Sequence, residues 1–194
     1  MCLSPNDDVL ASGTQKGHIQ IWSMQDSHEL VGTLETGNKM VLSTAFNIDA
    51  KLVSASIDGY VNLFDVSTQT VLHNFRAHAL PIRSVCFSPG GKVIYTASDD
   101  AHVAVHDVNS GKLIQQFSHK GMAFSVDASQ DHRHFAVGCA DGSTHIWDLG
   151  RRRKVQTFEQ HNNQCWNAQY NKYDMNNKQM FASVGQDALL QVYE

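Results

Sequence analysis

The sequence predicts an all-β protein built from repeated four-stranded sheets. Five stretches align at a period close to 42 residues, apolar and polar residues alternate within each period, and no stretch carries sustained helical spacing. The aligned stretches are SGTQKGHIQIWS (12–23), SASIDGYVNLFDV (54–66), TASDDAHVAVHDV (96–108), VGCADGSTHIWDL (137–149) and SVGQDALLQVYE (183–194). We therefore expect helices to be nearly absent.

An aromatic residue or a histidine recurs near the end of each aligned stretch. These residues are Trp22, Phe64, His106, Trp147 and Tyr193, with successive spacings of 42, 42, 41 and 46 residues. The last spacing is longer because residues 174–179 add polar residues in one turn. So regular a recurrence is not expected by chance and indicates a repeat architecture.

One period contains the signals of four short strands. In the third period these strands are expected at 82–88, 93–98, 103–107 and 113–117. Turn residues separate them: Pro89-Gly90-Gly91, Asp99-Asp100 and Asn109-Ser110-Gly111. A single sheet of this size cannot cover both of its own faces, so successive sheets are expected to pack face to face around an axis, as the blades of a β-propeller. The expected blades are 1–36, 37–77, 78–118, 119–160 and 161–194, or about four and two-thirds blades.

Composition excludes several classes of protein. Hydrophobic residues make up 42% of the chain and charged residues 18%, which does not fit a disordered chain. The net charge of −4 provides no general attraction for nucleic acid, and no apolar run is long enough to span a bilayer. The four cysteines lie far apart, so neither a disulfide framework nor a zinc site of the Cys-x-x-Cys type is expected. We expect no cofactor and no membrane contact.

The Trp-Asp and Phe-Asp pairs at 147–148 and 64–65, together with Trp22, resemble the signature of WD40 repeats. The weaker Gly-His signature of that family corresponds here to His78, His119 and His161. The resemblance implies a structural hydrogen-bond network of His, Asp, Ser or Thr and Trp in each blade. The candidate sets are His78, Thr96 and Asp100, then His119, Asp141 and Trp147, then His161, Ser183 and Asp187. Val137 cannot supply the hydroxyl group in the second set.

These trios of Ser or Thr, His and Asp could be mistaken for catalytic triads. Their recurrence in several blades favours a structural role over a single active site, and the sequence lacks the Gly-x-Ser-x-Gly nucleophile motif. We therefore expect no enzymatic activity. His132, His134, Cys139 and His145 are potential metal ligands, but strand alternation separates Cys139 from His134, which favours surface histidines over a shared metal site.

Candidate partner-binding residues follow the apolar position that opens each innermost strand. They are Leu42, Arg83, Phe124 and Trp166. Alternation directs them toward the mouth of the central channel, and aromatic residues and arginine are enriched at interface hot spots. The alternative is that Phe124 and Trp166 pack between blades. The basic run 151–154 lies in a turn, where it is either solvated or a contact for RNA or an acidic partner.

The segments AHALPIRSVCFSP, YTASDDAHVAVHDV and HNNQCWNAQYN resemble the small WD-repeat subunits shared by the superkiller and Paf1 transcription-elongation complexes. That family has seven blades, so the resemblance implies the C-terminal part of a seven-bladed ring. It also implies a protein scaffold in the nucleus and cytoplasm, monomeric within a hetero-complex, whose partners are a tetratricopeptide-repeat subunit, an RNA helicase and Paf1 complex subunits. Direct nucleic-acid binding is not expected. The alternatives are a substrate receptor of a cullin ubiquitin ligase and an RNA-contacting WD40 adaptor.

Overall fold

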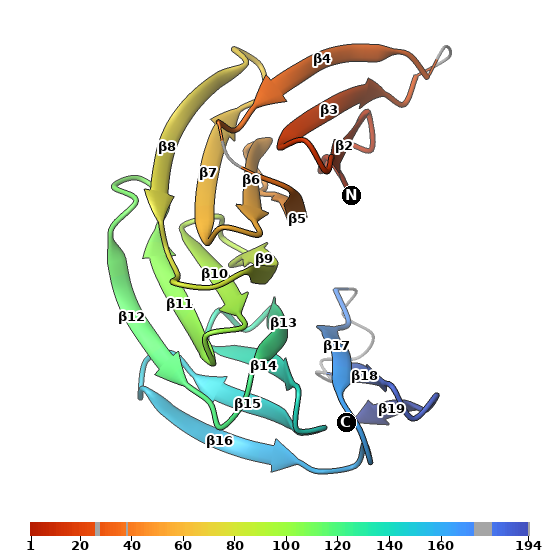
Figure 1. The fold of residues 1–194 in the computed structure, drawn as a ribbon, viewed down its shortest axis with the longest axis vertical. Helices are drawn as coiled ribbons and strands as arrows, with labels where there is room; N and C mark the ends of the chain where they lie inside the picture. The colour runs from red at the N-terminus through yellow and green to blue at the C-terminus, as the bar shows by residue number, and fades with distance from the viewer. Residues whose placement is uncertain (26–27, 38, 173–179, 194) are drawn as a thin grey trace.

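The computed structural model describes residues 1–25, 28–37, 39–172 and 180–193. Its antiparallel sheets fan out in an arc, with the first strand of each sheet toward the centre and the last toward the outside (Figure 1). The described residues contain no helix, and therefore none that is long and apolar enough to cross a membrane. The prediction of an all-β fold of four-stranded blades is confirmed. The polar insertion 174–179 lies outside the described residues.

Each sheet is formed by strands that follow one another in the chain. The first sheet comprises β1 (Cys2–Leu3), β2 (Val9–Gly13), β3 (His18–Ser23) and β4 (Leu30–Glu35); the second comprises β5 (Val41–Phe46), β6 (Lys51–Ser56), β7 (Tyr60–Asp65) and β8 (Thr70–Arg76). The third comprises β9 (Ile82–Phe87), β10 (Val93–Ser98), β11 (His102–Asp107) and β12 (Leu113–Ser118); the fourth comprises β13 (Ala123–Ala128), β14 (His134–Cys139), β15 (Thr144–Asp148) and β16 (Arg153–Phe158). The last described sheet comprises β17 (Cys165–Tyr170), β18 (Phe181–Gly185) and β19 (Leu190–Tyr193). In the third sheet, the expected strands agree with the structure to within one residue at each end.

The hydrophobic core is divided among the interfaces between consecutive sheets. Alternate residues of one strand point to opposite interfaces: Leu52 of β6 packs with the first sheet, whereas Val53 packs with the third. The largest of these clusters, between the third and fourth sheets, includes Tyr95, Phe117 and Phe135. Because both faces of the middle strands are covered, they are buried almost throughout and do not alternate between core and solvent.

Hydroxyl groups near the centre of the arc link each blade to the next. The Ser43 hydroxyl accepts a hydrogen bond from the backbone N–H of Val85 at 3.2 Å, and the Ser84 hydroxyl accepts one from Val126 at 3.3 Å. In each pair, the residue whose N–H donates lies 42 residues after the serine that accepts. These contacts fix the register between neighbouring innermost strands, and thereby the positions of the residues that these strands carry.

Candidate protein-binding face

The third blade contains a complete buried network. His78, just before β9, donates a hydrogen bond through Nδ1 to Asp100 Oδ2 at 2.9 Å, and the Thr96 hydroxyl donates to Nε2 at 2.8 Å. Burial lowers the pKa of His78 in spite of the neighbouring Asp100 carboxylate, so the ring is neutral and its second nitrogen can accept. The buried Thr96 hydroxyl has no access to a substrate, and the network holds the loop before β9 against the turn between β10 and β11.

The last blade repeats the arrangement with different residues. His161 Nδ1 donates to Asp187 Oδ1 at 3.0 Å, and the Ser183 hydroxyl donates to Nε2 at 2.8 Å. The phenol of Tyr193, at the position of the family's Trp, donates to the Ser183 hydroxyl at 3.2 Å. The same geometry in two blades is that of a repeated structural brace.

The fourth blade does not form the network expected from its sequence. Asp141 accepts hydrogen bonds from the hydroxyl and the backbone N–H of Ser143, and no hydrogen bond joins it to His119. Within the described chain, neither His119 Nε2 nor Trp147 Nε1 has a hydrogen-bond partner. The physical reason is that Val137 occupies the position of the hydroxyl residue, while Ser143 satisfies the carboxylate locally. The expected set of His119, Asp141 and Trp147 is therefore wrong as a hydrogen-bond network.

Three of the four candidate partner-binding residues lie together. Arg83, Phe124 and Trp166 line a hollow of about 460 Å³ with Met122 and Gln164. The rings of Phe124 and Trp166 stack with their centroids 5.4 Å apart and their planes 14° from parallel. Trp166 remains 51% exposed and Met122 45% exposed, so the stacked pair presents an apolar surface to solvent. We call the hollow lined by these five residues the upper-face hollow.

The guanidinium group of Arg83 is fixed at the edge of the hollow by Asp99. Its Nε donates to Asp99 Oδ1 at 2.8 Å and its Nη2 donates to Asp99 Oδ2 at 2.6 Å. These hydrogen bonds raise the pKa of Arg83, which stays charged. The guanidinium group has five N–H donors, so this pairing leaves three for another molecule.

Leu42 does not belong to this hollow. It lies between the first two blades, where it lines a small separate pocket of about 50 Å³ with residues that include Gly13 and Val41. The hollow thus brings together three of the four candidate residues, and a role of Leu42 in partner binding stays a prediction. The arc places the innermost strand of the second blade away from that of the last blade (Figure 1).

Other polar candidates are engaged in local contacts. Arg151 and Arg133 both approach the buried Asp148, whose pKa falls to about 2 because Arg133 donates hydrogen bonds to it. Lys154 lies over the ring of Trp147, with Nζ 5.5 Å from the centroid. The expectation of surface histidines holds for His132 but is wrong for His145, which is 4% exposed.

Comparison with known proteins agrees with the repeat geometry. A family model described as "WD domain, G-beta repeat" matches residues 69–107 and 111–148, and one described as "Anaphase-promoting complex subunit 4 WD40 domain" matches residues 1–82. The chain belongs to the WD40-repeat family.

Curated WD40 relatives align along most of this chain. "WD repeat-containing protein SL1-17" of Schistosoma mansoni is 34% identical over the whole chain, which spans 64% of that protein's length. "Pre-mRNA-processing factor 19" of Bos taurus is 26% identical over 83% of the chain and 32% of its own length. "Protein NEDD1" of Homo sapiens is 29% identical over 85% of the chain and 26% of its own length. The chain thus corresponds to a part of each of these relatives.

Sequence reasoning missed three residues at this WD40 face. Met122 and Gln164 lie two positions before Phe124 and Trp166, so strand alternation directs each pair to the same side. Asp99, which holds Arg83, lies in the turn between β10 and β11. The alternation signal was sufficient to find Met122 and Gln164, whereas the pairing with Asp99 depends on the register of β9 against β10.

Proposed function

We propose that this WD40 protein is a non-catalytic scaffold that binds a short segment of a partner protein in the upper-face hollow. The observation that carries the proposal is the exposed stack of Phe124 on Trp166 beside a fixed guanidinium group. Tryptophan and arginine are the residues most enriched at interface hot spots. An apolar side chain of the partner would cover the aromatic pair, and a carboxylate or carbonyl group would accept from Arg83.

Preorganisation favours such binding. Stacking restricts the rotamers of both aromatic side chains, and the two hydrogen bonds that Arg83 donates to Asp99 restrict the arginine before the partner arrives. The entropy cost of ordering these side chains is therefore met largely on folding and not on association. A segment of a few residues is the right size for a hollow of about 460 Å³.

The resemblance to the superkiller and Paf1 subunits supports a more specific proposal. The partners would be a tetratricopeptide-repeat subunit and an RNA helicase in messenger RNA decay, and Paf1 complex subunits in transcription elongation, so the protein would act in the cytoplasm and the nucleus. The names of the three relatives described above mention neither of these complexes. The charge around Arg151 is partly compensated by Asp148, which disfavours direct RNA binding as the main activity.

A pull-down with the tetratricopeptide-repeat subunit tests this proposal. We expect Trp166→Ala and Arg83→Glu to reduce capture at least about tenfold, since hot-spot truncations typically cost about 2 kcal/mol or more. Val155→Ala is a matched control, because Val155 is 50% exposed on the outer strand β16. Unchanged capture by both upper-face variants, with native circular dichroism, would show that this face is not the binding surface.

A further inference from the structure

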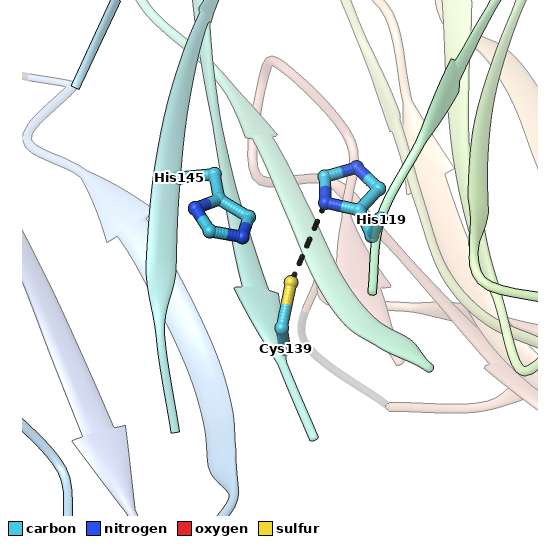
Figure 2. A group of neighbouring side chains, drawn as sticks. All are labelled: His119, Cys139 and His145. Carbon is cyan, nitrogen blue, oxygen red and sulfur yellow. Dashed lines mark hydrogen bonds between the residues drawn. The ribbon is translucent and has the colours of Figure 1, made fainter. Parts of the chain in front are cut away.

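A cluster of nitrogen and sulfur donors lies within the fourth blade. His119 follows β12, Cys139 ends β14, and His145 lies in β15, and one potential ligand atom of each falls within 4.8 Å of the others. The Cys139 thiol donates a hydrogen bond to His119 Nδ1 at 3.5 Å. Figure 2 shows the thiol pointing between the two imidazole rings.

The cluster occurs where the fourth blade departs from the structural network of its neighbours. Cys139 stands at the repeat position occupied by Ser98 and Gly185, and His145 stands at the position of Ala104 and Gln191. His119 has no hydroxyl or carboxylate partner here, so its ring faces Cys139. Among the described blades, this combination of donors is found in the fourth alone. Because the cluster is confined to one blade, the structural network shared by the third and last blades does not account for it.

The donor set and its spacing suit a zinc ion. Zn²⁺ bonds imidazole nitrogen at about 2.0–2.1 Å and thiolate sulfur at about 2.3 Å, so tetrahedral coordination separates N and S ligand atoms by about 3.6 Å. The 3.5 Å between His119 Nδ1 and Cys139 Sγ agrees with that separation. The other separations between ligand atoms are at most 4.8 Å, so a shift of His145 by roughly 1–1.5 Å completes the same geometry.

Two of the three donor side chains are buried. Cys139 is fully buried and His145 is 4% exposed. Zn²⁺ binds the thiolate form of cysteine, so the ion must displace the proton of the Cys139 thiol on binding.

Neighbouring side chains provide the support that metal ligands need. The Thr157 hydroxyl lies 3.2 Å from His145 Nδ1 and can hydrogen-bond to it, while the Ser143 hydroxyl lies 3.1 Å from Nε2, so a metal ion on Nε2 would replace the contact with Ser143. Lys154 Nζ lies 3.3 Å from that Nε2 and opposes a cation, but Lys154 is exposed on β16, so its ammonium group can move into solvent. Asp141 lies two residues after Cys139, between β14 and β15, and adds a compensating negative charge.

We propose that His119 Nδ1, Cys139 Sγ and His145 Nε2 bind one Zn²⁺ ion, with the fourth coordination position left to water. Binding forms the Zn–S bond and releases the thiol proton to solvent, so the site exchanges one proton for one metal ion. The ion joins the loop after β12 to β14 and β15 and replaces the hydrogen-bond brace that the third and last blades form. This inference does not depend on partner binding.

Metal titration of the full chain tests the site. The protein is first stripped of metal with a chelator and then incubated with Zn²⁺. We expect it to retain about one equivalent of Zn²⁺ through desalting and to melt at a higher temperature than the metal-free protein. With Co²⁺ as a probe, we expect thiolate-to-cobalt charge-transfer absorption in the near ultraviolet. This readout uses the unmodified chain, so it does not depend on whether a variant folds.

Variants then assign the ligands. Cys139→Ser and His145→Asn are expected to lower the Zn²⁺ affinity at least about 100-fold, whereas Cys165→Ser, which alters a buried cysteine in the next blade, is expected to leave it unchanged. Lys154→Gln is expected to raise the affinity, because it removes the opposing ammonium group. Failure of the unmodified chain to retain zinc, a cobalt spectrum without thiolate absorption, or equal affinity in Cys139→Ser would each overturn the proposal.

Discussion

The hydroxyl of Ser125 accepts a hydrogen bond at 2.9 Å from the backbone N–H of Ala168, 43 residues further along the chain. It also accepts one from Gly138 N–H at 3.3 Å, within its own sheet. One buried side chain thus satisfies two backbone donors in neighbouring blades. Ser43 and Ser84 make the corresponding contact at the two preceding interfaces.

The Ser125→Ala substitution tests this link between blades. It leaves two buried N–H groups without an acceptor, and we expect the free energy of unfolding to fall by about 1–3 kcal/mol. Ser43→Ala is the comparison: Ser43 is only half-buried, so water can replace it and the loss should be smaller. Urea denaturation followed by tryptophan fluorescence measures both, and an equal loss in the two variants would argue against the role of burial.

Gly142 occupies a turn that a larger residue cannot enter. Its φ of 84° is in the left-handed region, and an added Cβ would lie 2.4 Å from the carbonyl oxygen of His161 in the next loop. We expect Gly142→Ala to destabilise the protein by about 2 kcal/mol or more, because backbone strain adds to a clash with backbone.

The matched control is Gly150→Ala in the same blade. The nearest atom to its added Cβ is Asp148 Oδ1 at 3.6 Å, an ordinary contact. The stability of this variant should stay within about 0.5 kcal/mol of the parent. Thermal unfolding of the two variants checks the prediction, and similar melting temperatures would contradict it.

His106 makes stability depend on pH. Burial, aided by the neighbouring His78, lowers its pKa to about 4 from 6.5, and Nδ1 has no hydrogen-bond partner among the described residues. The unfolded chain therefore binds a proton that the folded chain does not bind between pH 6.5 and 4. Stability is retained in full above pH 6.5 and is lost progressively as the pH falls toward 4.

Replacing His106 by Phe should remove this dependence, since Phe keeps the ring contact with Phe75. Between pH 7.5 and pH 5, we expect the free energy of unfolding to fall by about 1–2 kcal/mol less in the variant than in the parent. Urea midpoints at the two pH values measure the difference. The variant His132→Asn, at an exposed position, should show the same pH dependence of stability as the parent. The prediction fails if His106→Phe also shows that dependence.

Arg83→Lys tests whether the fixed fork of the guanidinium group matters at the upper-face hollow. Lysine keeps the positive charge but cannot make two parallel hydrogen bonds to Asp99 and still present donors to a partner. We expect about tenfold weaker partner binding, which corresponds to about 1.4 kcal/mol. Isothermal titration calorimetry measures the affinity, and an unchanged value would show that charge alone is sufficient at this position.

The periodic part of the fold could be predicted because each repeat imposes the same local constraints. The alternation of Val103 and Val105, the turn at Asp99-Asp100 and the 42-residue period located strands to within one residue. The same periodicity aligned His78 with His161 and found their hydroxyl and carboxylate partners. It also brought Arg83, Phe124 and Trp166 to one face.

The exceptions arose where one blade departs from the repeat. Alternation along β14 separates Cys139 from His134, but it says nothing of His145 on the neighbouring strand or of His119 in a loop. The position of Asp141 depended on a competing contact with Ser143, two residues away. Leu42 has the equivalent repeat position, but the curvature of the arc separates its strand from the innermost strand of the last blade. Contacts between strands and competition among local partners are not encoded in a repeat alignment.

Hydroxyl-radical footprinting of the protein, alone and with the tetratricopeptide-repeat subunit, tests the central claim most directly. Both Trp166 and Met122 are exposed and oxidise readily, so each reports directly on coverage of the upper-face hollow. The proposal predicts that the partner protects Trp166, Met122 and Phe124 while oxidation of Leu113 on the outer strand β12 stays unchanged. Binding that leaves Trp166 and Met122 as reactive as in the free protein would contradict it.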